Sequence, residues 1–446
     1  MSFSAASLHA LLEPLVPEGA AGFVVALSGG DDSAALLGAM CALRDGHRSQ
    51  PLRAVHIDHG LQAAAGEFRD ACIRLCKQLS VPLEIISVSV STPPGASIEA
   101  AARDARYAAL AGAIAPGECL LTAHHRKDQA ESLLLQALRG AGVKGMAAMP
   151  ARRAFGKGWH VRPLLEVAQN ELLEFGAPFA LLGSIDPMNL DARFDRSYLR
   201  NAVWPMIEAR WPGADAALAR TARHMAEAQS LLDGSGAADL ALLRDGEALS
   251  VTGLRVLPAL RRMNAVRLWL REANVEAPST TRLVEALRQV LDAQEDHLPA
   301  IVWGAWALRR YRTRLFVTAA HPPRLLEPMA WEAAQGSSLD LGPDLGRLTW
   351  IAHPGGISAQ ALPRSVDVRR RNGGETLKPA KTASTQSVQH LLQSHGALPW
   401  LRDALPLVFA GDALIAVADL WMDAQRCVGA GEPGLAIEWS GGPVIC

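Results

Sequence analysis

Two glycines and two aspartates follow the first strongly apolar run of the chain, in the order SGGDDS at residues 28–33. Glycines let the backbone approach an anion closely, and the N–H groups of a helix beginning here would favour negative charge. Asp32 would repel a bare phosphate, so its presence suggests a Mg²⁺ between carboxylate and phosphate oxygens. The loop lacks the lysine of a Walker A sequence. The alternative is a turn in which Asp32 or Ser33 only caps the helix.

A second polar group, made of His124, His125, Asp128 and Glu131, follows the fourth apolar run. Asp128 and Glu131 are three residues apart and would share one face of a helix. Four such side chains could form a zinc site, and carboxylates at a helix start also act as dipole partners. Facing the Asp32 loop across a sheet, they would instead form a Mg²⁺ and nucleotide edge, where the two carboxylates hold the metal or an incoming amine.

Alternating strands and helices are expected to bring the two groups together. Apolar runs over 21–27, 51–57, 82–88 and 118–124 alternate with helix-period segments over 33–44, 64–79, 97–115 and 128–139. This alternation indicates βαβ units and a parallel sheet. The sequence therefore predicts an α/β fold with a doubly wound parallel sheet, in which ligands bind at the carboxyl ends of the strands.

The length of 446 residues predicts more than one domain. We expect a catalytic domain over 1–213, and a mainly helical domain over 214–320 that ends in a hairpin at 301–319. A linker over 321–346 and a small α+β domain over 347–446 would complete the chain. The helices of the second domain are expected over 214–232, 258–273 and 280–291, and the third domain is expected to place strands at 365–369 and 413–417 around a helix at 385–394.

Composition excludes several classes of protein. The net charge of −1 rules out a histone-like polycation, although local basic patches remain possible. No run reaches the ~18 apolar residues of a membrane span, and the first residues lack the basic region of a secretory signal. Six scattered cysteines suit a reducing compartment. We therefore expect a cytoplasmic protein with no membrane partner, and nothing in the sequence indicates an oligomeric state.

The motif at residues 28–33 resembles the signature of the PP-loop ATP pyrophosphatases. Other stretches are similar to those of one of their families, the tRNA(Ile)-lysidine synthetases. The resemblance is dense over residues 21–211, looser through the helical middle, and returns near the end. The matching stretches are HGL at 59–61, ARDARY at 102–107, HHRKDQAES at 124–132, RGAGVKG at 139–145, RPLL at 162–165, DPMN at 186–189 and LPWLRD at 398–403.

This resemblance implies a PP-loop, adenine nucleotide α-hydrolase-like fold and a two-step reaction. The wobble cytidine of a tRNA(Ile) with a CAU anticodon is adenylated by ATP with Mg²⁺, and the amine of free lysine then displaces AMP to give lysidine. Implied catalytic residues are Asp32, Arg103, Asp128 and Glu131, with Asp32 and Asp128 on the metal. Implied nucleotide contacts are Ser28, Gly29, Gly30, Asp31, Asp32, Ser33, His59 and His124.

Basic residues are concentrated in two segments. Residues 126–162 carry eight basic and two acidic side chains, and residues 364–381 carry six and two. Basic segments in two domains of a near-neutral chain favour phosphate contact with RNA, although each alone could be a solvated face. With the resemblance, the expected RNA-binding residues are Arg139, Lys144, Arg196, Arg200, Arg369, Arg370 and Arg371.

Three positions depart from the family pattern, namely Met188, Ser197 and Gln389. All lie outside the nucleotide loop, so they affect only the expected tRNA contacts. The alternatives are another PP-loop enzyme, such as a tRNA thiolase or an amide synthetase, and a non-catalytic RNA-binding protein. Cys72 and Cys76 have three residues between them, whereas thiolases commonly have two, and we expect both to pack in the core.

Overall fold

The structure, a computed structural model, describes residues 2–46, 50–58, 65–89, 98–180, 193–294, 297–325, 327–381 and 383–443. The chain divides into two compact units, Met1–Leu232 and Asp233–Cys446. Each unit is described by itself. The expected nucleotide contact His59, the DPMN stretch and the departure at Met188 lie outside the described residues.

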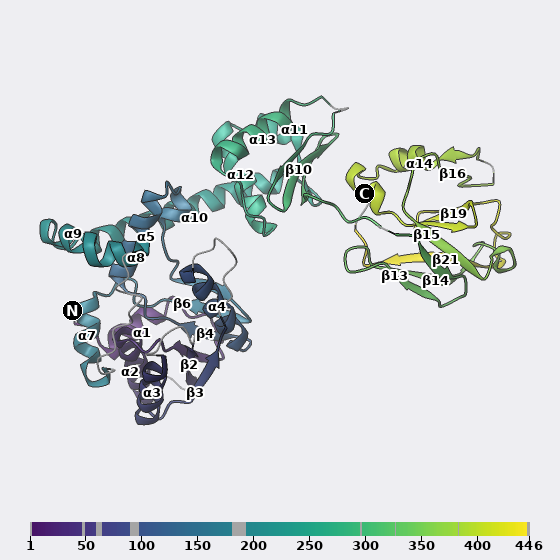
Figure 1. Cartoon of the computed structure of the whole chain (residues 1–446). Helices are drawn as coiled ribbons and strands as arrows, with labels where there is room; N and C mark the ends of the chain where they lie inside the picture. Colours follow the sequence, from purple (N-terminus) through teal and green to yellow (C-terminus); the bar gives the residue numbers. More distant parts are fainter. Residues whose placement is uncertain are drawn as a thin grey trace. The chain divides into compact units, whose positions relative to one another are not determined.

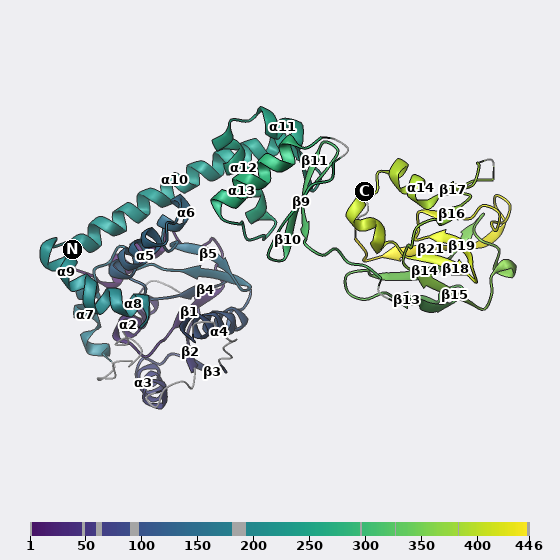
Figure 2. The same ribbon diagram turned by 45° about the horizontal axis from the view of Figure 1, so that its top comes forward.

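A six-stranded sheet forms the centre of the first unit (Figures 1 and 2). Its order is β3-β2-β1-β4-β6-β5, and all neighbours are parallel except β5 and β6. The first four strands confirm the strands predicted from the apolar runs. The bounds are β1 Gly22–Ala26, β2 Leu52–Asp58, β3 Leu83–Ser87, β4 Glu118–Leu121, β5 Arg152–Phe155 and β6 Gly158–Val161.

Helices cover both faces of this sheet, as a doubly wound fold requires. Residues of α1, α2, α3 and α7 share one apolar cluster with alternate residues of β1, and α4 packs on the opposite face. The predicted helices are confirmed within about three residues at each end. The bounds are α1 Ala5–Leu12, α2 Asp31–Gly46, α3 Ala65–Gln78, α4 Ile98–Ala113, α5 Arg126–Leu138, α6 Val143–Met146, α7 Gln169–Gly176, α8 Asp195–Tyr198 and α9 Trp204–Arg210.

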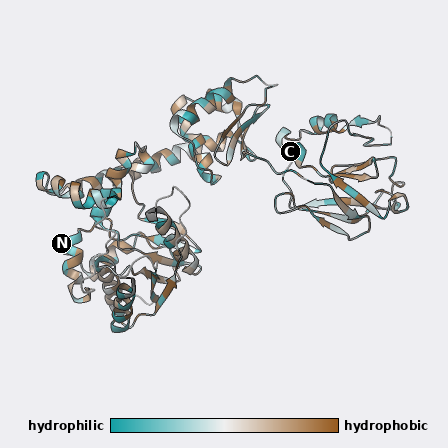
Figure 3. Cartoon of the chain, viewed as in Figure 1, coloured by the Kyte–Doolittle hydropathy of each residue, from teal (hydrophilic) through white to brown (hydrophobic). Residues whose placement is uncertain are grey.

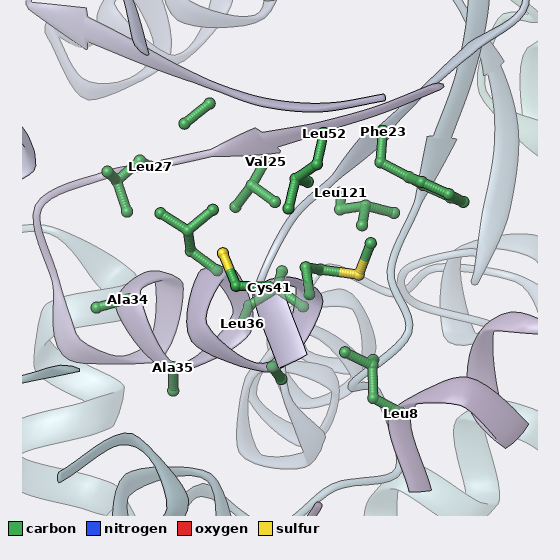
Figure 4. Close-up of a cluster of buried hydrophobic side chains, with 14 of the residues drawn as sticks. Leu8, Phe23, Val25, Leu27, Ala34, Ala35, Leu36, Cys41, Leu52 and Leu121 are labelled. Atoms are coloured by element: carbon green, nitrogen blue, oxygen red, sulfur yellow. The ribbon is translucent and has the colours of Figure 1, made fainter. Parts of the chain in front are cut away.

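Apolar side chains of β1 and α2 form a buried core beneath the candidate site. Phe23 and Val25 of β1 share one buried cluster with Leu36 of α2 (Figure 4). Val24 between them belongs to the cluster on the other face of the sheet. Burying each such side chain contributes about 2 kcal/mol. The loop between β1 and α2 is therefore held at both ends by buried elements.

The middle of the chain combines helices with a sheet. Helix α10 (Ala214–Leu243) contains the division between the two units. The predicted hairpin is present, but as part of a five-stranded sheet of order β7-β8-β11-β10-β9, so this region has more strand than expected. The bounds are β7 Arg244–Asp245, β8 Ala248–Ser250, α11 Val251–Val256, α12 Ala259–Glu272, α13 Thr280–Asp292, β9 Ala300–Trp303, β10 Trp306–Tyr311 and β11 Arg314–Ala319.

The last region is built from short antiparallel strands. The segments predicted at 365–369 and 413–417 are β15 and β19, and α14 occupies the predicted helical stretch. Hydrophobic residues, brown in Figure 3, lie among these strands, and Val366, Val368 and Ile415 belong to the buried core. The bounds are β14 Arg347–Pro354, β15 Ser365–Arg369, β16 Thr376–Leu377, β17 Gln386–Ser387, α14 Val388–His395, β18 Leu407–Ala410, β19 Ala413–Val417, β20 Trp421–Met422 and β21 Pro433–Ser440.

The stretch predicted as a linker over 321–346 contains two short strands that pair with strands of the last region. It contains β12 (Met329–Glu332), which pairs with β15, and β13 (Ser338–Asp340), which pairs with β14. Trp331 is buried in the same core and stacks on Trp350 at 4.9 Å between ring centroids. Short strands flanked by glycine and proline are easily mistaken for loops, because their side chains give too few alternations to count.

Among the described helices, none is long and apolar enough to cross a membrane.

Candidate active site

The glycine-rich turn lies between the end of β1 and the start of α2. Gly29 has a φ of +88°, and a Cβ at this position would lie 2.9 Å from the Phe68 ring, so both backbone and space require glycine. The Ser33 hydroxyl donates to the Gly30 carbonyl at 2.8 Å and accepts from the Ser28 N–H at 3.2 Å. Ser33 thus closes the turn from inside, whereas Ser28 and Gly30 are exposed and available to a ligand.

Asp32 carries a carboxylate oxygen without a partner. Its Oδ1 is buried and has no hydrogen bond in the described part of the chain, and its Oδ2 accepts from Gln169 Nε2 at 3.5 Å. Burial raises the pKa of Asp32, the nearby His125 lowers it, and Asp128 raises it further. A buried, unpaired carboxylate oxygen is costly unless something binds it. A hard cation such as Mg²⁺ fits this donor.

The start of α5 places Asp128 opposite the glycine turn. Asp128 Oδ2 accepts from the backbone N–H of His125 at 3.1 Å, which satisfies a free donor at the helix start. The buried His125 ring lies between two carboxylates, with Nε2 3.7 Å from Asp32 Oδ2 and 3.4 Å from Asp128 Oδ2. The two groups predicted from the sequence therefore meet at the carboxyl end of the sheet.

Two arginines bind the carboxylates of α5. Arg196 Nη2 donates to Asp128 Oδ1 at 3.0 Å, and its Nε donates to Glu131 Oε2 at 3.2 Å. Arg200 Nη2 also reaches Asp128 Oδ1, at 2.7 Å, and Arg200 binds both oxygens of Glu131. The arginines come from α8 and the following single π-helical turn, Leu199–Val203. The structure therefore places these two predicted RNA contacts in ion pairs within the site.

The arginines change the electrostatics of the site. Burial alone would raise the pKa of Asp128, but His125, Arg196 and Arg200 outweigh it and lower the pKa to about 2. Burial would also lower the pKa of Arg200, yet its bonds to Glu131 and Asp128 raise it. Glu131 is fully buried. In this arrangement Asp128 is ionised at neutral pH and is a weak base.

Arg103 and Arg106 lie on α4 around Tyr107. The guanidinium carbon of Arg103 is 5.0 Å from the Tyr107 ring centroid, and that of Arg106 is 5.7 Å away. Arg103 is exposed, whereas burial lowers the pKa of Arg106. Arg103 is also close enough to His124 to affect its pKa. The predicted catalytic arginine thus lies over Tyr107 on α4, and its charge acts on the predicted nucleotide contact His124.

His124 belongs to a hydrogen-bonded row that the sequence analysis missed. Its Nδ1 is 2.8 Å from Thr122 Oγ1, and the same hydroxyl is 2.9 Å from Nε2 of the buried His160. Arg162 Nη2 lies 3.2 Å from His160 Nδ1, and Nη1 of Arg162 donates to the Pro150 carbonyl at 2.7 Å. His160 and Arg162 are two residues apart, which places both on the same side of an extended chain. Two polar residues at this spacing beside an apolar strand were the pattern that could have indicated the row.

The remaining predicted RNA contacts are spread over separate elements. Arg139 follows α5, is largely exposed, and pairs with Asp195 at 3.1 Å, and Lys144 lies in α6. Arg369 pairs with Asp367 at 2.7 Å and covers the Phe409 ring at 4.9 Å, and Arg371 lies 3.7 Å from Asp403. Arg370 is exposed.

Two alternatives from the sequence can be compared with the structure. Cys72 and Cys76 are both buried in the main core, as expected for packing residues. In the described ranges, no group of three or more His, Cys, Asp or Glu side chains is arranged to hold a metal ion by itself. Asp32 and Asp128 are the carboxylates that flank His125, so a cation here would also need oxygen ligands from a substrate.

Three family descriptions match successive parts of the chain. A PP-loop domain matches residues 3–207, a TilS substrate binding domain matches residues 249–316, and a TilS substrate C-terminal domain matches residues 366–439. The first match contains the glycine turn and every candidate catalytic residue.

Curated proteins similar to the chain share one name, tRNA(Ile)-lysidine synthase. The protein of Coxiella burnetii is 40% identical over 397 residues, 89% of this chain and 88% of that protein. The protein of Alkalilimnicola ehrlichii is 38% identical over 404 residues, 90% of each chain. The protein of Xanthomonas campestris pv. campestris is 39% identical over 409 residues, 90% of this chain and 91% of that protein. The similarity therefore spans nearly the whole chain.

Proposed function

Because the chain belongs to the tRNA(Ile)-lysidine synthase family, we propose that it converts the wobble cytidine of a tRNA(Ile) with a CAU anticodon into lysidine, consuming ATP and free lysine. The cytidine C2 oxygen attacks the α-phosphorus of ATP, and pyrophosphate leaves. The lysine ε-amine then attacks C2, and AMP departs with that oxygen. In this reaction the enzyme is a ligase that forms a carbon–nitrogen bond.

The observation that carries this proposal is the meeting of Asp32 and Asp128 on either side of His125. The glycine turn lies at the start of α2, where the helix dipole and the backbone favour the negative charge of phosphate oxygens. The unpaired Oδ1 of Asp32 fits a Mg²⁺ ion. When bound, Mg²⁺ would neutralise charge on the departing pyrophosphate.

Asp128 and Glu131 suit a cationic amine as well as a metal. Both already bind positively charged groups, the guanidinium groups of Arg196 and Arg200. We infer that these arginines move aside when a cationic substrate group enters, which also restores proton-accepting capacity to the carboxylates. Arg103 near His124 would stabilise negative charge on the adenylated intermediate.

Mass spectrometry of tRNA(Ile) after incubation with ATP and isotopically labelled lysine tests this function. We expect one lysine to be added to the wobble cytidine and one AMP to be released for each. ATP–pyrophosphate exchange measured without lysine should require the tRNA. Exchange that needs a sulfur donor would favour a thiolase, and tRNA binding without exchange would favour a non-catalytic RNA-binding protein.

A further inference from the structure

Four side chains form a continuous row of hydrogen bonds from the buried interior to the candidate site. Arg162 contacts His160, His160 contacts Thr122, and Thr122 contacts His124, at 3.2, 2.9 and 2.8 Å. Arg162, His160 and Thr122 are buried, with exposed fractions of 4%, 0% and 7%. Only His124, at the site end of the row, is partly exposed. The row therefore connects the interior with one residue of the site.

The chemistry of arginine fixes where the protons lie at the inner end. A guanidinium group has donors and no acceptor, so His160 Nδ1 must accept from Arg162 and carries no proton. A neutral imidazole then has its proton on Nε2. His160 Nε2 consequently donates to Thr122 Oγ1.

The Thr122 hydroxyl accepts from one histidine and donates to the other. It accepts from His160 and has a single proton to donate. His124 Nδ1 is the other contact of this oxygen among the described residues. If His124 Nδ1 carried a proton instead, the buried hydroxyl proton would have no acceptor there, which costs about 1–3 kcal/mol. Thr122 therefore donates to His124 Nδ1, and the proton of a neutral His124 is on Nε2.

Burial, together with positive charges around the row, keeps both imidazoles neutral. Burial is the largest effect that lowers the pKa of His160, which falls to about 2. The charges of Arg162, Arg153, His124 and Arg103 lower it as well. Burial lowers the pKa of His124 to about 3 against the attraction of Asp128, with Arg162, Arg196 and Arg103 also lowering it. The named charged groups lie on α4 (Arg103), β5 (Arg153), α5 (Asp128), α8 (Arg196) and the segment after β6 (Arg162).

We infer that Thr122, His160 and Arg162 are positioning residues that hold His124 as the neutral tautomer with its proton on Nε2. His124 thus donates a hydrogen bond in the site and accepts no proton there. Its acceptor, a phosphate oxygen of the nucleotide, rests on the proposed function. The tautomer rests on the row alone. His124 is therefore excluded as the base for the amine.

Nitrogen-15 NMR of the imidazole rings measures the tautomer, because protonated and unprotonated ring nitrogens resonate at well-separated frequencies. We would label the histidines of the full chain and record spectra at pH 7.5 without ATP or RNA. The His124 signals are identified by their loss in His124→Gln. The expected result is a protonated Nε2 and an unprotonated Nδ1 in the unaltered chain.

Two substitutions of Thr122 distinguish the effect of its hydrogen bonds from the effect of its volume. Thr122→Val removes the hydroxyl at nearly constant volume, and both His124 nitrogens should shift to the intermediate frequencies of exchanging tautomers. Thr122→Ser keeps the hydroxyl, and the original pattern should persist. A protonated Nδ1 in the unaltered chain, or His124 signals unchanged by Thr122→Val, would overturn the inference.

The NMR experiment is independent of the proposed function. The tautomer is read from the spectrum of the unaltered chain, and the His124→Gln variant serves only to assign its signals. Failure of the lysine-addition assay would leave the tautomer result unaffected. An unexpected tautomer would likewise leave the lysine-addition result unaffected.

Discussion

Arg200 and Glu131 form a two-point ion pair at the centre of the candidate site. Arg200 Nε donates to Oε1 at 2.9 Å, and its Nη2 donates to Oε2 at 2.7 Å. The Glu131 side chain has no exposed surface, so its charge depends on this arginine and on Arg196. A buried carboxylate of this kind is stable only while it is paired. The pair thus joins α5 to the segment that carries both arginines.

We predict that Glu131→Ala lowers the local stability of α5 by about 2 kcal/mol, because two half-buried guanidinium groups lose a charged hydrogen-bond partner. Hydrogen exchange of amides in Arg126–Leu138 measures this without averaging over both units. The matched control is Glu174→Ala, since Glu174 is exposed on α7 and should change stability by less than about 0.5 kcal/mol. Equal effects of the two substitutions would contradict a structural role for the ion pair.

We predict that Asp32→Asn raises the melting temperature without divalent cations while slowing adenylation on the order of 10³-fold. Burial raises the pKa of Asp32, so its favourable contribution is present at low pH and lost as pH rises through the folded-state pKa. At pH 7 the ionised group therefore destabilises the fold, and the neutral amide removes this cost.

The control is Asp31→Asn on the exposed neighbouring residue, which should leave the melting temperature within about 1 °C. Adding Mg²⁺ with ATP should stabilise the unaltered chain more than Asp32→Asn. A lower melting temperature for Asp32→Asn, or the same Mg²⁺ response in both proteins, would count against Asp32 as the metal ligand.

We predict that Cys72 and Cys76 resist alkylation in the folded chain. Burial raises the pKa of Cys72 to about 12 and that of Cys76 to about 11, so almost no reactive thiolate exists at pH 8. Cys427 is partly exposed and serves as the internal control. Iodoacetamide labelling followed by peptide mass spectrometry should show at least about tenfold slower reaction at Cys72. Rapid labelling of Cys72 would reopen the thiolase alternative.

The features that could be predicted from the sequence depend on residues that are close together along the chain. The apolar run before Ser28 indicated β1, and the spacing of Asp128 and Glu131 indicated that both share a face of α5. The arginine partners of these carboxylates lie 65 to 72 residues further along the chain, and His160 is 38 residues from Thr122. Such pairs are set by the tertiary fold, and hydrophobic periodicity carries no information about them. The use of Arg196 and Arg200 inside the site was unpredictable for this reason.

The basic segment of the C-terminal region gives the last prediction, that Arg370→Ala weakens tRNA binding more than Arg369→Ala does. Arg370 is exposed, whereas Arg369 pairs with Asp367 and covers Phe409, which leaves it less free to reach a phosphate. Fluorescence anisotropy of labelled tRNA at several salt concentrations should show that Arg370→Ala reduces the slope of log affinity against log salt by about 1. Arg288→Ala, an exposed residue paired with Glu285, is the charge-matched control and should keep the slope. An unchanged slope for Arg370→Ala would place the phosphate contacts on another face of the protein.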